Sequence, residues 1–578
     1  MVHSSLAAPI CSGECPKESS FSVLLKGSLH SRKILCFFVM TFVLSCGLSN
    51  LAYACTDGAC AQDAVVENGN VRFESIPDQN TMNIYADNFA AVSFQNFSIP
   101  EGAAVNVIQG NPDDHFLINV KGQEASVIAG RLSSTSILHL INPNGIYFTP
   151  TAIVNVNSLV ASTLAIDMKN FREHNFVYER KQQAALAQIL NEGTIRANRN
   201  VAMIAGAVSN QGVIIARAGS VNLASGNKTT VSFDAKGTIN VVVNEKTTGK
   251  VIDLKTGKDV RDAVANKAGA VIEGANVAMS AETAEEVFAN AVNQEGIVKA
   301  TGMVEENGVI RIGASQDVAV SGTLDAGTEG KVEVVSEKSV TVDKPLATVG
   351  ETKIEANEDV NVRADVSTEG DLAVLADRDN NGTGELTQEA GTTLYAKGEG
   401  SLSVDGSGTM TLAELKTDQG AIKVGTVRTP DAIAGDPVYT HTEGDIEITA
   451  KGEQGDTVRL ATSRGDSLLY SKAGTVSLKA PQGAVRDLTP SPIAAYKALF
   501  EAKSFLIFSV APETTFTKAD GIYISSVSKG DGIVVTLAGE TFGTVRYLET
   551  SAVTLQTQWD AITAPGVTIP GSSVKVIA

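Results

Sequence analysis

Cysteine is missing from almost the whole chain. All six cysteines fall within the first sixty of the 578 residues, so the remainder can hold neither a disulfide framework nor a cysteine-based metal site. Aromatic residues make up only 5% and tryptophan occurs once, as Trp559, which argues against a large aromatic core. Glycine is plentiful at 52, and valine, threonine and alanine recur throughout. This composition favours many short strands joined by tight turns.

Long apolar runs are scarce, and the one candidate lies near the N-terminus. It follows three basic residues and precedes a small-x-small sequence, which is the order of a signal peptide with a long front extension. These features are Lys26, Arg32, Lys33, the apolar residues 34–44 and residues 52–54. The run is short for a membrane span. We expect residues 1–54 to be a signal peptide cleaved near Ala54, with Ala61 and a lipoprotein-like site at Cys46 as alternatives.

Basic residues are in the minority. The chain has 46 Lys and Arg against 65 Asp and Glu, which gives a net charge of −19. A body this acidic should repel nucleic acid and anionic membrane surfaces, so neither is expected as a partner.

From about residue 65 onward, apolar and polar residues alternate in short segments that predict strands and turns, as in residues 238–243. An Asn-x-Gly repeat begins at Asn191, returns at Asn210 and returns again, with one residue inserted, at Asn293. The first two glycines are separated by about the length of one solenoid coil. We therefore predict an all-β fold, a right-handed parallel β-helix with an N-terminal cap. A β-sandwich would show the same alternation but not the repeat.

Three stretches lack the period-two pattern; the first predicts a helix or an excursion from the β-helix, and the other two predict short helices. They are residues 174–190, 282–291 and 493–502. The third follows Pro490 and Pro492, so it marks a predicted boundary before a terminal piece.

One short segment has the residue order of a turn between two apolar strands. It consists of Asn142, Pro143, Asn144, Gly145 and Ile146. Proline presets φ at the first corner, asparagine favours turn positions, and glycine relieves strain at the exit. Its chemistry alone predicts a turn and nothing more.

Four segments around this turn follow one another in an order and spacing that carry a family resemblance. They are Phe-Gln-Asn-Phe-Ser-Ile at 94–99, the segment 119–132, Leu-Ile-Asn-Pro-Asn-Gly-Ile-Tyr-Phe at 140–148, and residues 152–164. Over about residues 65–234 the chain resembles the secretion domain of the filamentous haemagglutinin family. The form is closer to the high-molecular-weight adhesins, because an Asn-Pro-Asn-Leu segment of filamentous haemagglutinin itself is missing.

The resemblance implies an exported protein of two-partner secretion. Such a chain is recognised by the periplasmic repeats of an outer-membrane β-barrel transporter, crosses the outer membrane unfolded, and folds outside, where it is secreted or stays at the cell surface. Residues 142–146 are then the candidate secretion motif, through direct recognition or by shaping the cap. The expected domains are a secretion domain at 65–234, a β-rich passenger at 235–490 and a terminal β-rich segment at 491–578.

Two further motifs suggest ligands. Arg464, Gly465 and Asp466 match the integrin-binding tripeptide, with an ordinary solvated turn as the alternative. A second segment places oxygen-bearing side chains at alternate positions, as a calcium loop does, although Gln388 stands where a closing carboxylate is expected. Its candidate ligands are Asp377, Asp379, Asn381 and Glu385, and a polar turn between coils is the alternative. No other cofactor is expected.

Three function classes fit these observations: an adhesin or haemagglutinin-like rod that contacts a host receptor or glycan, the stalk of a toxin or contact-dependent effector, and a polysaccharide-acting enzyme. The six histidines are scattered along the sequence, and no nucleophile elbow or zinc pattern appears. His139 lies in an apolar strand and is expected to be packed. We expect a non-enzymatic adhesin.

Overall fold

The computed structural model describes residues 63–181, 185–301, 307–406, 410–426 and 439–450, followed by shorter stretches. The shorter stretches are residues 457–460, 469–472, 474–487, 493–494, 497–507, 513–517, 521–524, 533–537, 540–545 and 573–576. The predicted signal peptide lies outside these residues. Within the described part of the chain, no helix combines the length and the apolar character needed to cross a membrane.

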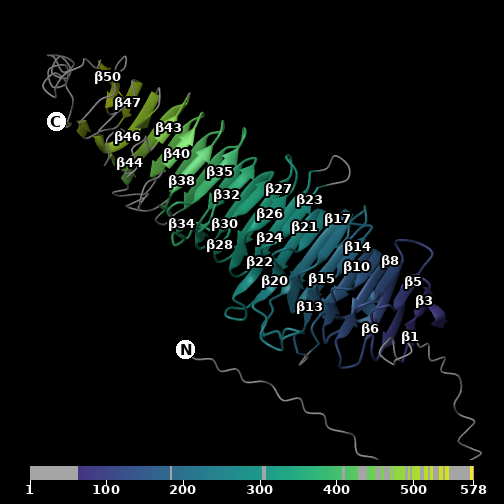
Figure 1. Ribbon diagram of the computed structural model, residues 1–578. Coiled ribbons are helices and arrows are strands. Elements are labelled where there is room, and N and C mark those ends of the chain that lie inside the picture. Colours follow the sequence, from purple (N-terminus) through teal and green to yellow (C-terminus); the bar gives the residue numbers. More distant parts are fainter. Residues whose placement is uncertain are drawn as a thin grey trace, which may run out of the picture. The chain divides into compact units, whose positions relative to one another are not determined.

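The chain winds into coils, and between residues 126 and 411 these coils place strands on three faces (Figure 1). Strands of successive coils pair in parallel and in register, so that Leu346 pairs with Val366 on the first face and Val340 with Val360 on the third. This is the predicted parallel β-helix. The predicted N-terminal cap is also present, because β1 (Val65–Asn68) and β2 (Val71–Ile76) pair antiparallel with their neighbours before parallel stacking begins.

The strands group by face. The first face holds β3 (Thr81–Ala86), β5 (Ala104–Ile108), β14 (Thr194–Ala197), β23 (Ile297–Ala300), β26 (Gly322–Asp325), β29 (Leu346–Val349), β32 (Val366–Glu369), β35 (Thr393–Lys397), β38 (Glu414–Thr417), β40 (Tyr439–Thr442), β43 (Leu469–Ser471) and β45 (Ile493–Ala494). The second holds β4 (Ala90–Phe94), β6 (His115–Val120), β15 (Val201–Ala205), β24 (Val309–Ala314), β27 (Lys331–Ser336), β30 (Glu351–Ala356), β33 (Leu372–Leu375), β36 (Leu402–Gly406), β39 (Ile422–Thr426) and β41 (Ile446–Ala450). Long strands run over both faces: β8 (Arg131–Ile141), β10 (Ile153–Ser162), β17 (Val213–Ser225) and β21 (Val271–Ala281).

The third face is an 11-stranded sheet. It holds β7 (Ser126–Ile128), β9 (Ile146–Phe148), β13 (Gln188–Asn191), β16 (Ala207–Asn210), β20 (Asp262–Asn266), β22 (Asn290–Gln294), β25 (Val318–Val320), β28 (Val340–Val342), β31 (Val360–Val362), β34 (Leu386–Gln388) and β37 (Met410–Thr411). The pairing continues toward the C-terminus through β42 (Thr457–Leu460), β44 (Thr475–Asp487), β46 (Lys497–Ile507), β47 (Glu513–Thr517), β48 (Gly521–Ile524), β49 (Ile533–Leu537), β50 (Glu540–Val545) and β51 (Ser573–Val576).

The period-two alternation of the sequence places every second side chain inside the coil. On the second face Val334, Ile354 and Val374 are in register and at most 2% exposed, so each stacks on the same kind of side chain above and below. Burying one aliphatic side chain contributes about 1.5–3 kcal/mol. Because the burial comes from neighbouring coils, no coil is stable alone.

The Asn-x-Gly repeat forms a buried ladder of side-chain amides on the third face. The amide of Asn191 donates to Asn210 at 2.8 Å, Asn210 donates to Asn266 at 2.8 Å, and Asn266 donates to Gln294 at 2.9 Å. All four side chains are fully buried. The sequence repeat therefore has a structural role, because each side-chain amide donates a hydrogen bond to the amide oxygen of the next coil.

Two details of this ladder differ from the sequence repeat. Asn266 belongs to it but was not identified, because its glycine follows after three residues rather than two. In the third repeat the ladder position is Gln294 rather than Asn293, because the inserted residue shifts the register by one. Asn293 instead donates to Asp262 at 3.0 Å.

For residues 174–190 the predicted excursion from the β-helix is confirmed, and the alternative of a helix is wrong. The chain leaves the coil here, but it forms β12 (Phe176–Glu179) of a four-stranded antiparallel sheet with β11 (Ala165–Ile166), β18 (Lys228–Phe233) and β19 (Ile239–Glu245). Phe176 and Tyr178 alternate inward along β12 and are buried by this sheet, so tertiary packing overrides helix propensity. A helix, α1 (Met168–Arg172), precedes the stretch, and a 3₁₀ turn, η1 (Pro77–Gln79), lies in the cap.

The two other predicted helices are also wrong. Within 282–291, Thr283 forms a parallel bridge with Thr247, and β22 begins at Asn290. Within 493–502 the chain forms β45 and the start of β46, which pairs with β44. Alanine-rich and glutamate-rich segments favour helix locally, but parallel pairing with the preceding coil dominates here.

Removal of one amide from the ladder should weaken the stack. Asn210→Ala leaves the amide N–H of Asn191 and the amide oxygen of Asn266 buried without a partner, at about 1–3 kcal/mol for each group. Hydrogen exchange at β13, β16 and β20 should therefore report a local stability lower by about 2–5 kcal/mol. The control is Asn361→Ala on β31, where the side chain is partly exposed and a change within about 0.5 kcal/mol is expected. Equal hydrogen-exchange rates in the two variants would contradict the claim that the amide ladder stabilises the stacked coils.

Candidate functional site

The predicted turn at 142–146 is a corner of the β-helix between β8 and β9. The N–H of Gly145 donates to the carbonyl oxygen of Asn142 at 3.1 Å, which closes the turn. Gly145 has φ +117°, a conformation that favours glycine. Asn142 and Ile146 are fully buried. The turn predicted from the sequence is therefore confirmed, with its two ends buried and its central residues, Pro143 and Asn144, partly exposed.

The asparagine side chains of this corner fasten it to the preceding coil. The Asn142 amide donates to the carbonyl oxygen of Glu124 at 2.9 Å and to Ser126 Oγ at 3.0 Å. Its oxygen accepts the backbone N–H of Asn144 at 2.9 Å, and the Asn144 amide donates to the carbonyl oxygen of Gly122 at 2.8 Å. Residues 122–126 belong to the same family pattern, so the pattern describes one hydrogen-bonded corner.

A second segment covers the corner from outside. A Cβ placed on Gly145 would lie 2.9 Å from Cδ2 of Leu254 and 3.2 Å from the carbonyl oxygen of Gln188. Leu254 is held there because its N–H donates to the Gln188 side chain at 3.1 Å. In the folded chain Asn142, Gly145 and Ile146 are thus enclosed, whereas Pro143 and Asn144 stay partly exposed.

Three of the histidines that are scattered in the sequence lie together in the structure, which corrects the sequence-based interpretation. His115 Nδ1 and His139 Nε2 are 2.9 Å apart, and His139 Nδ1 is 2.6 Å from the hydroxyl of Tyr178. The ring of His174 stacks on Phe89, with centroids 4.0 Å apart. Parallel register brings His115 and His139 close, since β6 pairs with β8, and the antiparallel sheet supplies Tyr178.

This cluster fills the space between the β-helix and the four-stranded antiparallel sheet. His139 and Tyr178 are fully buried, as expected for His139, and Phe176 stacks on both His115 and His139. Burial lowers the pKa of His115 to about 4, helped by the nearby charge of His174. Burial also lowers the pKa of His139 and raises that of Tyr178. At neutral pH His115 and His139 are therefore uncharged, and their rings serve packing.

The candidate calcium loop folds as a compact polar turn. The carboxylate of Asp377 accepts the backbone N–H groups of Asn381 at 2.8 Å and Gly382 at 2.9 Å. Asp379 accepts from Asn381, while the N–H of Glu385 donates to Asp359 at 2.9 Å. In the part of the chain that the structure describes, no group of three or more histidines, cysteines or carboxylates is arranged to hold a metal ion. These bonds supply a structural reason for the oxygen-rich sequence.

The second sequence-derived ligand motif cannot be placed. Arg464, Gly465 and Asp466 lie outside the described residues, so receptor binding at this tripeptide stays a prediction.

A hollow that the sequence did not reveal lies on the first face, across β26, β29, β32, β35 and β38. Its volume is about 750 Å³. Two carboxylates lie at its rim, and both bind the same residue: Asp365 accepts the N–H of Thr393 at 2.9 Å, and Glu414 accepts its hydroxyl at 3.3 Å. The residues come from different coils, which is why sequence proximity does not show them.

The chain is thus a capped parallel β-helix with a tight Asn-Pro-Asn-Gly corner and an antiparallel side sheet. A family model described as "TPS secretion domain" matches residues 59–334. Over these residues, just under half of its length, the chain carries the secretion domain of two-partner secretion exoproteins. Such exoproteins are exported across the outer membrane, so this chain acts at the cell surface or in the extracellular space.

Two curated relatives are both described as "Heme/hemopexin-binding protein" of Haemophilus influenzae. One is 29% identical over 156 residues and the other 24% identical over 253 residues. The alignments cover 27% and 43% of this chain but only 16% and 26% of the relatives. The matched part of this chain thus spans no more than about a quarter of the length of these relatives.

Two solved structures are also similar. The HMW1 secretion domain from Haemophilus influenzae is 23% identical, with a TM-score of 0.39, and the match covers 72% of this chain and 100% of that one. The filamentous hemagglutinin secretion domain is 14% identical, with a TM-score of 0.23, and the match covers 63% and 99%.

Acid should loosen the antiparallel sheet. The pKa of His115 is about 4 in the folded chain and about 6.5 when unfolded, so the unfolded state binds more protons between these values and stability falls as the pH drops. Between pH 7 and pH 5 this residue alone should lower the local stability by about 2 kcal/mol. Hydrogen exchange at β12 and β18, corrected for intrinsic rates, measures the loss. His115→Gln should flatten the dependence of this local stability on pH, whereas His441→Gln should leave it unchanged. The same slope in the parent and both variants would show that the histidine cluster does not cause the acid sensitivity.

Proposed function

We propose that this chain is an exported binding rod that an outer-membrane β-barrel transporter moves out of the periplasm. The family match supports a transporter as the partner, because the TPS secretion domain is the export module of these exoproteins. We further propose that the rod acts by binding, in the manner of an adhesin, rather than by catalysis. The open hollow on the first face, lined by residues from five successive coils, supports a binding role.

The observation that carries the export proposal is the way each coil depends on the one before it. The cap pairs antiparallel and closes the first coil, so it offers a template onto which later coils stack in parallel. After residue 60 the chain has no cysteine, so no disulfide hinders threading. Coils that form outside the cell hold the emerging chain there, and stacking pulls the rest forward without an external energy source.

The enclosed corner suggests how the secretion motif is read. Asn142 and Ile146 are buried and Gly145 is covered by Leu254 in the folded chain. We propose that the periplasmic repeats of the transporter bind residues 142–146 in an extended chain, through main-chain hydrogen bonds of the strand-addition type. Folding then removes the motif from the transporter, which makes release part of the folding reaction.

Replacing the motif should block export. Asn144→Ala combined with Gly145→Ala should leave the protein in the periplasm, as fractionation of medium, periplasm and washed cells will show. Asn210→Ala is the matched control, since it damages the same third face outside the motif, and it should still reach the medium. Normal secretion of the motif variant would remove residues 142–146 from the mechanism, and equal retention of both would assign the defect to folding.

A second candidate function is binding of haem or of a haem-carrying protein, in line with the description of the two relatives. His441 on β40 and Tyr470 on β43 stack with centroids 4.4 Å apart and ring planes 19° apart. With Lys416 and Lys472 they line a hollow of about 380 Å³. Histidine and tyrosine both serve as ligands of haem iron, and lysines suit the propionate groups.

Haem binding has a direct spectroscopic test. Titration of the purified chain with haemin should shift the Soret band if His441 and Tyr470 receive the iron. His441→Ala and Tyr470→Phe should each weaken binding by about tenfold or more, while Tyr147→Phe on the third face serves as the control. A parent chain that leaves the haemin spectrum unchanged would contradict this second function.

A further inference from the structure

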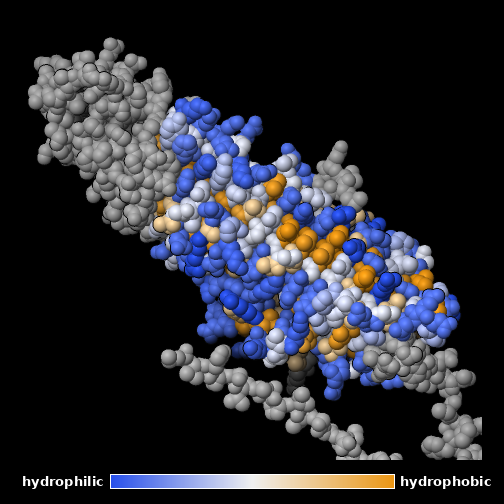
Figure 2. All heavy atoms as spheres, viewed as in Figure 1, coloured by the Kyte–Doolittle hydropathy of each residue, from blue (hydrophilic) through white to orange (hydrophobic). Residues whose placement is uncertain are grey.

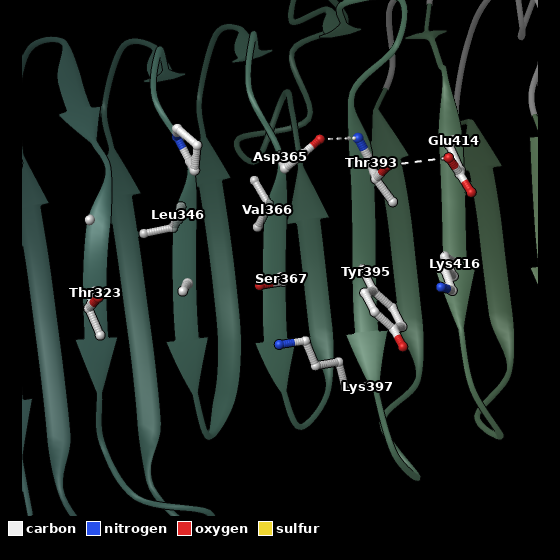
Figure 3. A pocket seen from close by; sticks show the side chains of 13 residues that line it. Thr323, Leu346, Asp365, Val366, Ser367, Thr393, Tyr395, Lys397, Glu414 and Lys416 are labelled. Atoms are coloured by element: carbon white, nitrogen blue, oxygen red, sulfur yellow. Dashed lines mark hydrogen bonds between the residues drawn. The ribbon is translucent and has the colours of Figure 1, made fainter.

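One row of outward side chains on the first face changes from small to large. Thr323, Ala347, Ser367, Tyr395 and Lys416 are in register on successive coils. The small residues form a floor, and Tyr395 stands beside this floor on the next coil (Figure 3). The hollow of about 750 Å³ has the size of a ligand site but is open to solvent along its length.

Tyr395 is held in a fixed orientation. Its hydroxyl donates to Asp418 at 2.6 Å, and Nζ of Lys416 lies 4.3 Å from the centre of its ring. Since Lys416 comes from the following coil, it covers one face of the ring. The opposite face lies on the side of Ser367, where the floor begins. One face of the ring is therefore covered, and the other borders the hollow. That second face can contact a ligand without any change in the orientation of the ring.

Polar groups of both signs surround the floor. Figure 3 shows Asp365, Thr393 and Glu414 at one end of the strands and Lys397 at the other, with its side chain extended toward the strand of Ser367. A carboxylate has about four lone-pair sites, so the single bonds from Asp365 and Glu414 to Thr393 leave both able to accept more. Lys397 and Lys416 balance these two charges.

We propose that this hollow is a binding subsite for a neutral oligosaccharide. A sugar ring rests on Ala347 and Ser367 with its C–H bonds against Tyr395, because the face of an aromatic ring is negative and C–H bonds are weakly positive. Its hydroxyls bind Lys397 and the two carboxylates, since each hydroxyl both donates and accepts. The proposal deepens the binding role proposed above and rests on it, but not on the export route.

Charge and topology favour this ligand class over others. The two lysines are matched by two carboxylates and the chain has a net charge of −19, so a nucleic acid or a sulfated chain finds no excess positive charge. The strands that carry the floor are paired on both sides, so an extended peptide finds no edge to join.

The same row also gives room for a chain of several sugars. Toward the N-terminus it continues through Ile297 and Val271, and Ile297 is 36% exposed. Figure 2 shows apolar side chains gathered over this part of the surface. Aliphatic side chains offer further surface for the C–H faces of sugar rings. A linear oligosaccharide that follows the stacking direction would therefore contact several coils.

Calorimetric titration of the purified full chain, secreted or refolded, with a panel of neutral and uronate-containing oligosaccharides tests the proposal. At least one neutral oligosaccharide should bind, Tyr395→Ala should weaken it about tenfold or more, and Tyr395→Phe should keep most of the affinity because the ring remains. Ala347→Trp, at an exposed position, fills the floor without removing a contact and should also block binding.

Tyr147 provides a matched control. Its hydroxyl also binds a carboxylate, that of Glu192 at 2.5 Å, and Lys255 lies over its ring at 5.8 Å, but it belongs to the third face. Tyr147→Ala should bind like the parent. No binding of any neutral member at millimolar concentration, binding confined to uronates, or full binding by both Tyr395→Ala and Ala347→Trp would overturn the proposal. A refolded chain that binds while secretion fails would separate this result from the export proposal.

Discussion

Every coil of this protein depends on its neighbour to bury its apolar side chains. In-register parallel pairing stacks aliphatic side chains on aliphatic side chains, as with Val334, Ile354 and Val374. It also aligns the side-chain amides of Asn191, Asn210 and Asn266. Interior burial and amide pairing therefore arise from the same register. A slip of one residue would turn the apolar positions outward and leave the amides unpaired, so the register is strongly determined.

The same constraint explains how far the sequence predicts the fold. Period-two alternation and the Asn-x-Gly spacing are local signals, so the parallel β-helix, its cap and the corner at 142–146 were predicted correctly. Asn266 was missed because its glycine is displaced by one position. The helices at 174–190, 282–291 and 493–502 were wrong because helix propensity is local, whereas strand pairing with a distant coil is not.

The sites show the same limit more strongly. His115, His139 and Tyr178 are brought together by one parallel and one antiparallel pairing, and no spacing in the sequence announces the contact. The hollow beside Tyr395 likewise takes residues from consecutive coils of unequal length. The corner at 142–146 was recognisable because all its partners lie within about one coil of it. Its enclosure by Leu254 was not, since that segment enters from a later excursion.

In the proposed export route, stacking links structure to export, because the growing stack would cover the corner at 142–146 and hold the emerging chain outside. The most direct test compares bacteria that express the chain with and without its partner transporter, with culture medium and washed cells assayed separately for folded, protease-resistant protein. The account predicts protected protein outside the cell only when the transporter is present, and unfolded, protease-sensitive chain in the periplasm when it is absent. Protected protein in the medium without the transporter, or a fully folded rod in the periplasm that is still exported, would contradict it.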